Sequence, residues 1–238
     1  MNPTLRLLLL LALAAAPRAG AALESAQLNP DNVLPTFPGG LQLQGITRGE
    51  VVVAVSVNTE GRVADFLVLG YTQESLARRC REALPEWRFT PARLDGVPVP
   101  TQLTLQVSFT LEGAVVSGNG LNHFFFDHLD SWGDGRLSYR LHHAGEIDRV
   151  PARVSTVTPK YAREAEQQGV RGKVRVNFYI DEEGRVRLPS VDSAPQPYLA
   201  EKAVAAVREW RFAPPTSLGE PVLVAASQEF DFSAAGGK

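Results

Sequence analysis

Apolar and polar residues alternate along two stretches of the chain, as in strands that bury one face. In residues 173–181 the apolar positions are Val174, Val176, Phe178 and Ile180, and the polar ones are Lys173, Arg175, Asn177, Tyr179 and Asp181. In residues 51–57 the buried positions are predicted to be Val51, Val53, Val55 and Val57. The turns at residues 58–61 and 181–184 begin with Asx and end with Gly61 or Gly184, which suits glycine at positive φ. With return strands at residues 62–69 and 185–192, we predict two β-hairpins.

A helical pattern follows each hairpin. Its apolar positions, spaced i, i+4, i+8 and i+11, are Leu76, Cys80, Leu84 and Trp87 in one case and Leu199, Ala203, Val207 and Trp210 in the other. We interpret Trp87 and Trp210 as core anchors rather than ligand platforms, because each ends an apolar stripe and has a large area to bury. The lone Cys80 is interpreted as a buried filler. Pro85 is expected to kink or shorten the last turn of the first helix.

The chain contains two copies of one module. The run Glu86-Trp87-Arg88-Phe89 recurs as Glu209-Trp210-Arg211-Phe212, 123 positions later, and at this offset residues 49–109 align without a gap on residues 172–232. Last strands at residues 99–111 and 222–232 complete a β-β-α-β order. We therefore predict an α+β fold of two tandem modules, each a three-stranded antiparallel sheet packed on a helix. At least one outer strand of such a sheet keeps unpaired backbone groups.

Composition and charge narrow the class of protein. The 238 residues are 44% hydrophobic and 21% charged, which is typical of globular domains. Residues 1–22 carry Arg6 ahead of an apolar run at 7–16, which predicts a cleaved signal peptide and export. The alternative is an uncleaved membrane anchor, but a span needs about 20 apolar residues and this run is half as long. A formal net charge of −2 gives no electrostatic footprint for nucleic acid.

The spaced motifs of the second copy identify a family. They are Pro159-Lys160-Tyr161, the 181–186 turn, Trp210-Arg211-Phe212-Ala213-Pro214, Gly219-Glu220-Pro221 and Phe230-Asp231-Phe232. In this order they resemble the C-terminal domain of the TonB family of periplasmic energy transducers. The first copy resembles it less completely, since Gly39-Gly40 replaces a helix-forming stretch at residues 163–168, so its first helix is in doubt. The expected organisation is a degenerate domain at 23–112, a connecting segment at 113–144 and a fuller domain at 145–235.

The resemblance implies a function in peptide binding. In that family the domain adds the TonB box of an outer-membrane receptor as a strand to its sheet edge, where backbone hydrogen bonds give affinity. By resemblance the receiving edge is the last strand, through the backbone of Val222, Val224 and Ala226, with Tyr161 near the partner segment. This implies a periplasmic protein linked to energy-dependent transport across the outer membrane.

Two features of the family are missing from the sequence, so alternatives stay open. Residues 1–22 hold no histidine, and no long proline-rich spacer is present. The alternative function is therefore a periplasmic adaptor or scaffold without energy transduction. The alternative localisation is an inner-membrane anchor facing the periplasm. Other envelope proteins, peptidoglycan, or the two copies paired as a pseudo-dimer are the alternative partners.

The connecting segment holds candidate metal ligands. All four histidines lie there, with three aspartates among them, and the set is His123, His128, His142, His143, Asp127, Asp130 and Asp134. A histidine-based metal site is the sharper hypothesis, but no pair has a compact ligand spacing, so we predict no metal. Residues 124–126, three phenylalanines, are interpreted as an edge cover or a partner patch. Since no nucleophile or phosphate-loop motif occurs, we predict neither an enzyme nor a cofactor.

Overall fold

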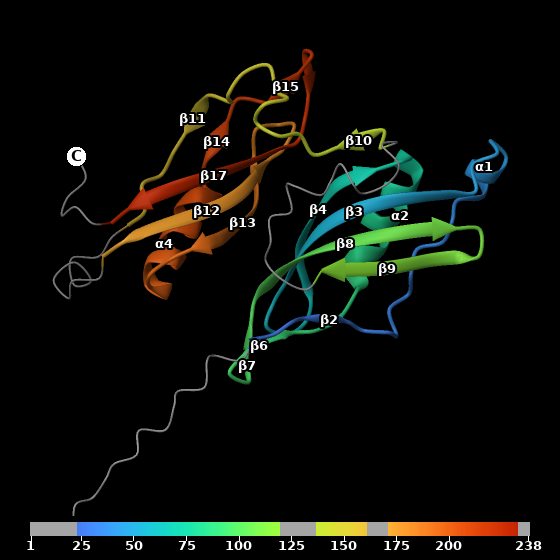
Figure 1. The fold of residues 1–238 in the computed structure, drawn as a ribbon, viewed down its shortest axis with the longest axis horizontal. Coiled ribbons are helices and arrows are strands. Elements are labelled where there is room, and N and C mark those ends of the chain that lie inside the picture. The colour runs from blue at the N-terminus through green and yellow to red at the C-terminus, as the bar shows by residue number, and fades with distance from the viewer. Residues whose placement is uncertain (1–22, 120–136, 161–170, 233–238) are drawn as a thin grey trace, which may run out of the picture.

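The computed structural model describes residues 23–119, 137–160 and 171–232. It contains two modules, copy one (residues 23–119) and copy two (residues 145–232), each with a hairpin, a helix and a closing strand (Figure 1). In copy one these are β3 (Arg48–Val57), β4 (Val63–Tyr71), α2 (Glu74–Ala83) and β8 (Thr101–Thr110). In copy two they are β12 (Lys173–Ile180), β13 (Val186–Ser193), α4 (Pro197–Arg208) and β17 (Val224–Asp231). The predicted α+β class and the β-β-α-β order are confirmed.

The hairpin turns are fixed by an Asx residue and a glycine, as the sequence predicts. Asn58 Oδ1 accepts the backbone N–H groups two and four residues later at 3.1 and 2.8 Å, and Asp181 Oδ1 accepts its counterparts at 3.1 and 2.8 Å. Gly61 and Gly184 have φ of 74° and 77°. A Cβ on either would lie 2.0 or 1.9 Å from a backbone carbonyl oxygen. Only glycine fits this turn.

The helix of copy one is shorter than the helix of copy two because a proline follows it. In copy one α2 ends at Ala83 and a 3₁₀ turn, η1 (Leu84–Glu86), carries Pro85. Without such a proline α4 runs for 12 residues. The prediction that Pro85 shortens the last α-helical turn is confirmed. A first helix does form in copy one, since α1 (Gly39–Gln42) makes a single turn that buries Leu41 despite its two glycines.

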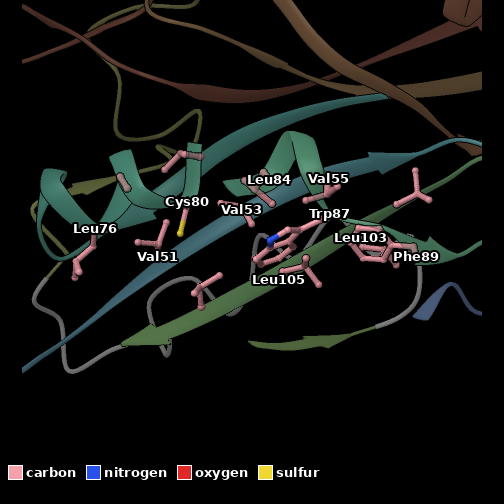
Figure 2. Packing of buried hydrophobic residues seen from close by; sticks show 14 of the residues in the cluster. Val51, Val53, Val55, Leu76, Cys80, Leu84, Trp87, Phe89, Leu103 and Leu105 are labelled. Atoms are coloured by element: carbon pink, nitrogen blue, oxygen red, sulfur yellow. The ribbon is translucent and has the colours of Figure 1, made fainter. Parts of the chain in front are cut away.

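Each copy has its own core between sheet and helix. In copy one Val51, Val53 and Val55 face Leu76, Cys80 and Leu84, with Trp87 among them (Figure 2). Copy two repeats this packing with the residues Val174, Val176, Phe178, Leu199, Ala203, Val207 and Trp210. Burial raises the pKa of the Cys80 thiol to about 12. A thiol that stays protonated is a poor nucleophile.

The sheet of copy one is wider than the sequence predicts. Its strand order is β10-β4-β3-β8-β9, because β9 (Gly113–Asn119) and β10 (Tyr139–Arg140) add to the two sides. The sheet of copy two keeps the three strands β13-β12-β17. The remaining strands are short: β1 (Leu23–Glu24), β2 (Gln27–Leu28), β5 (Phe89–Thr90), β6 (Ala92–Leu94), β7 (Val97–Val99), β11 (Arg153–Ser155), β14 (Arg211–Phe212), β15 (Thr216–Ser217) and β16 (Glu220–Pro221).

The two copies pack on each other through the sheet faces that their helices leave uncovered. A third apolar cluster joins them, made of Val52, Ala54 and Leu69 of copy one, Leu141 of the connecting segment, and Tyr179, Leu188 and Leu223 of copy two. The prediction of a wet face was wrong for Asn177, which is buried, for Tyr179, which is 5% exposed because it packs against copy one, and for Asp181, which is buried in its turn. At the same junction Tyr139 stacks on Tyr71 at 5.0 Å and donates its hydroxyl hydrogen to Glu182.

Candidate functional site

In copy one the strands β9 and β10 flank the three strands of the repeated module. On one side β9 pairs antiparallel with β8 from Thr104 opposite Asn119 to Thr110 opposite Gly113. On the other side β10 pairs with the end of β4, where Tyr139 lies opposite Tyr71. A sheet edge whose backbone groups are already paired offers little to an incoming strand. In copy one the counterpart of the predicted receiving edge is thus already occupied.

The outer edge of β17 in copy two is open over most of its length. At its start His142 forms a single parallel bridge, donating its N–H to the carbonyl of Leu223 at 2.9 Å and accepting the N–H of Ala225 at 3.4 Å. Beyond Ala225, no strand of the described residues pairs with the outer side of β17. The edge that remains runs from Ala226 to Asp231.

The bridge to His142 also fixes which backbone groups point outward. Because Ala225 turns its N–H away from β12, alternation along an antiparallel ladder turns Ser227 and Glu229 outward too. Val224 and Ala226 point their N–H and C=O groups at β12. The backbone of these two residues is therefore used within the sheet. The N–H of Val222, which precedes β17, is bonded to the carbonyl of Pro215 at 2.9 Å.

The opposite edge of this sheet is poorly suited to pairing. Strand β13 contains Pro189, has φ of 44° at Leu188 and shifts register twice against β12. Copy one also holds this edge, since Gln102 Nε2 donates to the carbonyl of Leu188 at 3.1 Å and Arg187 donates to Asp65 at 2.9 Å. Proline, bulges and covering contacts all discourage strand addition. Of the two edges of the copy two sheet, β17 is therefore the regular one.

Charged and polar side chains border the open edge. Glu229 accepts hydrogen bonds from Lys173 at 3.0 Å and Arg175 at 3.4 Å, and the bond from Lys173 lowers the pKa of Glu229 while raising that of Lys173. On the helix side Arg153 donates to Gln228 Oε1 at 2.6 Å, and Gln228 Nε2 donates to the outward carbonyl of Glu229 at 2.6 Å. A side-chain amide is a weak and replaceable cap for this carbonyl, so a strand could take its place.

A cavity adjoins the start of the same edge. It has a volume of about 650 Å³, and its walls include Ile147, Val150, Pro151, Asn177, Ala226 and Ser227. Val150 is 82% exposed. Cavities of this size are typical of ligand sites. An incoming strand that pairs with β17 would carry a side chain past this cavity.

The predicted anchors lie beneath the edge rather than at it. Trp210 is 4% exposed, donates its Nε1–H to the carbonyl of Val157 at 2.8 Å and lies 5.6 Å from the ring of Phe230 on β17. Trp87 is buried in the same way and donates to the carbonyl of Val33 at 3.1 Å. Their buried N–H groups are satisfied, so both rings act in packing.

Several predicted features lie outside the described residues. They are the signal peptide at 1–22, His123, Asp127, His128, Asp130, Asp134, the phenylalanines at 124–126, and Tyr161. Among the residues that are described, no three histidine, cysteine, aspartate or glutamate side chains cluster as metal ligands would. In the same part of the chain, no helix is long and apolar enough to cross a membrane.

Comparisons with known proteins point to one family. The model of the Gram-negative bacterial TonB protein C-terminal domain matches residues 34–111 and 157–234. Protein TonB of Vibrio cholerae is 33% identical over 93 residues, which is 39% of this chain and 36% of that protein. Protein TonB of Pseudomonas aeruginosa is 33% identical over 99 residues, 39% of this chain and 29% of that protein, so the match spans about a third of each relative. The solution NMR structure of the Pseudomonas aeruginosa TonB C-terminal domain matches with 26% identity and a TM-score of 0.32, over 41% of this chain and 98% of that one.

Proposed function

Because the chain belongs to the TonB C-terminal domain family, we propose that copy two binds an extended peptide segment by adding it as a strand to β17. The observation that carries this proposal is the regular outer edge from Ala226 to Asp231, on which no described strand lies. Strand addition needs a row of free backbone donors and acceptors at the spacing of a sheet. The N–H and C=O groups of Ser227 and the N–H group of Glu229 face outward, and an incoming strand would displace the side-chain amide of Gln228 from the carbonyl of Glu229.

Copy one serves as a support for copy two in this proposal. Its β8 edge is occupied by β9, and its outer sheet face is buried against Tyr179, Leu188 and Leu223. The copies would then act as a pseudo-dimer that presents one receptive edge. Fixing β12 and β13 on a second domain would keep β17 in place when a bound segment pulls on it.

The partner that fits the family is the TonB box of an outer-membrane receptor, and the proposed setting is the periplasm. Two relatives are named Protein TonB, which supports a part in energy-dependent transport across the outer membrane. Residues near Tyr161 would lie on the lead-in to the bound segment. The role of Tyr161 stays a prediction, as do the signal peptide and any coupling to a motor.

The decisive experiment changes single backbone donors. Proline at Ser227 or Glu229 removes an outward N–H but leaves the ladder with β12, because neither residue donates to that strand. A synthetic TonB-box peptide, titrated into the full chain by calorimetry, should bind at least about tenfold more weakly to Ser227→Pro and Glu229→Pro, since each loses one hydrogen bond and its strand geometry.

Alanine at the same positions is the matched control, since it removes the side chain and keeps the N–H. Ser227→Ala and Glu229→Ala should bind within about threefold of wild type, which corresponds to the small effect of exposed polar groups. Circular dichroism would check that the proline variants keep their fold. Unchanged affinity in both proline variants would rule out β17 as the receiving edge.

A further inference from the structure

The outer side of β9 is an open sheet edge that the proposed peptide site does not use. In Figure 1, β9 is the last strand on its side of the copy one sheet, and it pairs with β8 over residues 113–119 without a register shift. Within the described ranges, no strand pairs with the other side of β9. Such an edge presents a row of backbone donors and acceptors to any strand that approaches it.

The register of the sheet fixes which groups of β9 face outward. Thr72 donates its N–H to the carbonyl of Glu50 at 3.0 Å, so Glu50 directs its backbone groups away from β8. The same holds two residues later for Val52, which leaves Gln106, opposite Val52, to bond with Ser117 of β9. By alternation, the residues of β9 whose N–H and C=O groups face outward are Ala114, Val116 and Gly118.

The strand β9 lacks the features that usually protect an edge strand. Natural edges discourage pairing with charged side chains, prolines or bulges. Residues 113–119 contain no charged residue and no proline, and their register against β8 is unbroken. By contrast, β17 carries Glu229 and Asp231, and β13 contains Pro189 and shifts its register. Of these three edges, β9 is therefore the one that can pair with an uncharged strand without a like-charge or steric cost.

The sequence of β9 is complementary to a second copy of itself. When two identical antiparallel strands are related by a two-fold axis, the same surface is used on both chains. With the axis at Val116, this residue lies opposite its own symmetry mate and Ala114 lies opposite Gly118, so every outward group is bonded. On the other face Val115, which is 66% exposed, lies opposite the exposed Ser117. Because the strand carries no charge, no like charges meet across the axis.

We propose that two copies of this chain associate through β9, with a two-fold axis at Val116. The pairing joins the two copy one sheets into one continuous antiparallel sheet. It involves no residue of copy two, so each chain of the dimer keeps its own β17 edge. The inference is therefore independent of peptide binding by β17.

A proline at the axis tests the pairing, and analytical ultracentrifugation of the full chain over a dilution series measures the dimer dissociation constant. Val116→Pro removes the outward N–H of both chains and keeps the bonds to β8, so it should weaken the dimer at least about thirtyfold through the loss of two hydrogen bonds. Val116→Ala is the matched control. It keeps the N–H and should stay within about fivefold of wild type, which is the effect of one cross-strand contact.

Paired charges test the register of the two strands. Val115→Lys combined with Ser117→Lys places like charges opposite each other across the axis, whereas Val115→Lys combined with Ser117→Glu places opposite charges there. Both positions are exposed, so neither change should disturb the monomer. The first double variant should form a dimer at least about tenfold weaker than the second.

Three results would overturn the proposal. They are a wild-type chain that stays monomeric at about 100 µM, where even a weak specific dimer is populated, a dimer that survives Val116→Pro, and equal dimers from the two charge variants. Calorimetry with the TonB-box peptide separates this outcome from a failure of the β17 site. Monomeric Val116→Pro should bind the peptide as wild type does, because β17 is unchanged.

Discussion

Copy one and copy two have cores of the same design, but the outer edge of the last strand is paired in copy one and mostly unpaired in copy two among the described residues. The outward groups of β8 are paired with β9 over seven residues, from Gly113 to Asn119. Among the described residues, the outward groups of β17 are bonded to His142 at the start of the strand and, at the carbonyl of Glu229, to the side-chain amide of Gln228. The segment that makes the difference, β9, belongs to copy one but follows residues 49–109, the part of copy one that is repeated in copy two. A duplicated module can thus be turned into a support or a binding domain by the short stretch of chain attached to the end of its last strand.

The comparison also shows what duplication has kept. Each copy buries one tryptophan whose Nε1–H is bonded to a carbonyl of the lead-in segment, Val33 in one copy and Val157 in the other. Each copy also has a glycine, Gly61 or Gly184, at the same position of its hairpin turn. A Cβ on this glycine would clash with the carbonyl oxygen of Phe89 or Phe212. These positions serve the core and the turn, which every copy needs. The edge is free to diverge.

The largest expected effect removes the shared anchor. Trp87→Ala and Trp210→Ala should each lower the free energy of unfolding by about 3–5 kcal/mol, as is usual when a buried tryptophan becomes a cavity. Urea denaturation of the full chain measures this. Val115→Ala on β9 is the control, because Val115 is 66% exposed and should change stability by less than about 0.5 kcal/mol. A small loss in only one tryptophan variant would show that the two cores are not equivalent.

A proline in β9 should make copy one resemble copy two. Ser117 lies opposite Gln106, whose backbone points away from β3, so its N–H faces β8. Ser117→Pro removes a central bond of this pairing and should uncover the β8 edge. The TonB-box peptide should then bind with a stoichiometry of two per chain instead of one, as measured by calorimetry.

The neighbouring residue provides the matched control for that change. The N–H of Val116 faces away from β8, so Val116→Pro leaves the ladder bonds in place. Its peptide stoichiometry should remain that of wild type. If both proline variants bind one peptide, β8 is not a concealed copy of the β17 edge.

The repeated part of the fold could be predicted from the sequence because each element there has a local signal. Alternation gives the hairpins, the 76-80-84-87 spacing gives α2, and the Asx-Gly turns give the connections. The strand β9 was missed because its residues, with Ala114, Val115 and Val116 in succession, do not alternate. An edge strand with both faces partly wet is not required to alternate.

The junction and the site depend on long-range pairing that side-chain patterns do not report. The unbroken apolar run Val51-Val52-Val53-Ala54-Val55 was a usable signal that both faces of β3 are covered. Which backbone groups of β17 face outward depends on register, since a shift of one residue reverses every group. The family resemblance implied the backbone of Val222, Val224 and Ala226, whereas the pairing with β12 and His142 turns Ser227 and Glu229 outward.

Acid should weaken the ion pair between Arg140 and Glu146, here called the clip, which holds the connecting segment over the start of β17. Arg140 pairs with Glu146 at 2.5 Å, and this hydrogen bond lowers the pKa of Glu146 to about 2. Because the folded pKa lies below the unfolded value, the stabilisation is full above about pH 4.5 and is lost as the pH falls toward 2. Both side chains are about a third exposed, so the loss should be no more than about 1 kcal/mol.

Hydrogen exchange at low pH measures this effect locally. In wild type the N–H of Ala225, which His142 covers, should exchange faster relative to the core as the pH falls from about 5 to about 2.5. Glu146→Gln should show fast exchange at every pH and little further change. Protection of Ala225 that stays constant across this range in wild type would contradict the role of the clip.

The smallest expected effect concerns the ion pair between the copies. Arg187 Nη2 lies 2.9 Å from Asp65 Oδ1, but the Asp65 side chain is 47% exposed. Arg187 also donates to the carbonyl of Phe66 at 3.0 Å, a bond that Asp65→Asn would keep. We expect this variant to lose about 0.5 kcal/mol of stability, a difference that fades in high salt. Leu223→Ala, in the apolar cluster of the same junction, should cost about 2–5 kcal/mol. Urea denaturation of both variants therefore compares how much the ion pair and the apolar cluster contribute to the contact between the copies. A larger loss of stability for Asp65→Asn than for Leu223→Ala would show that charge, and not apolar burial, holds the copies together.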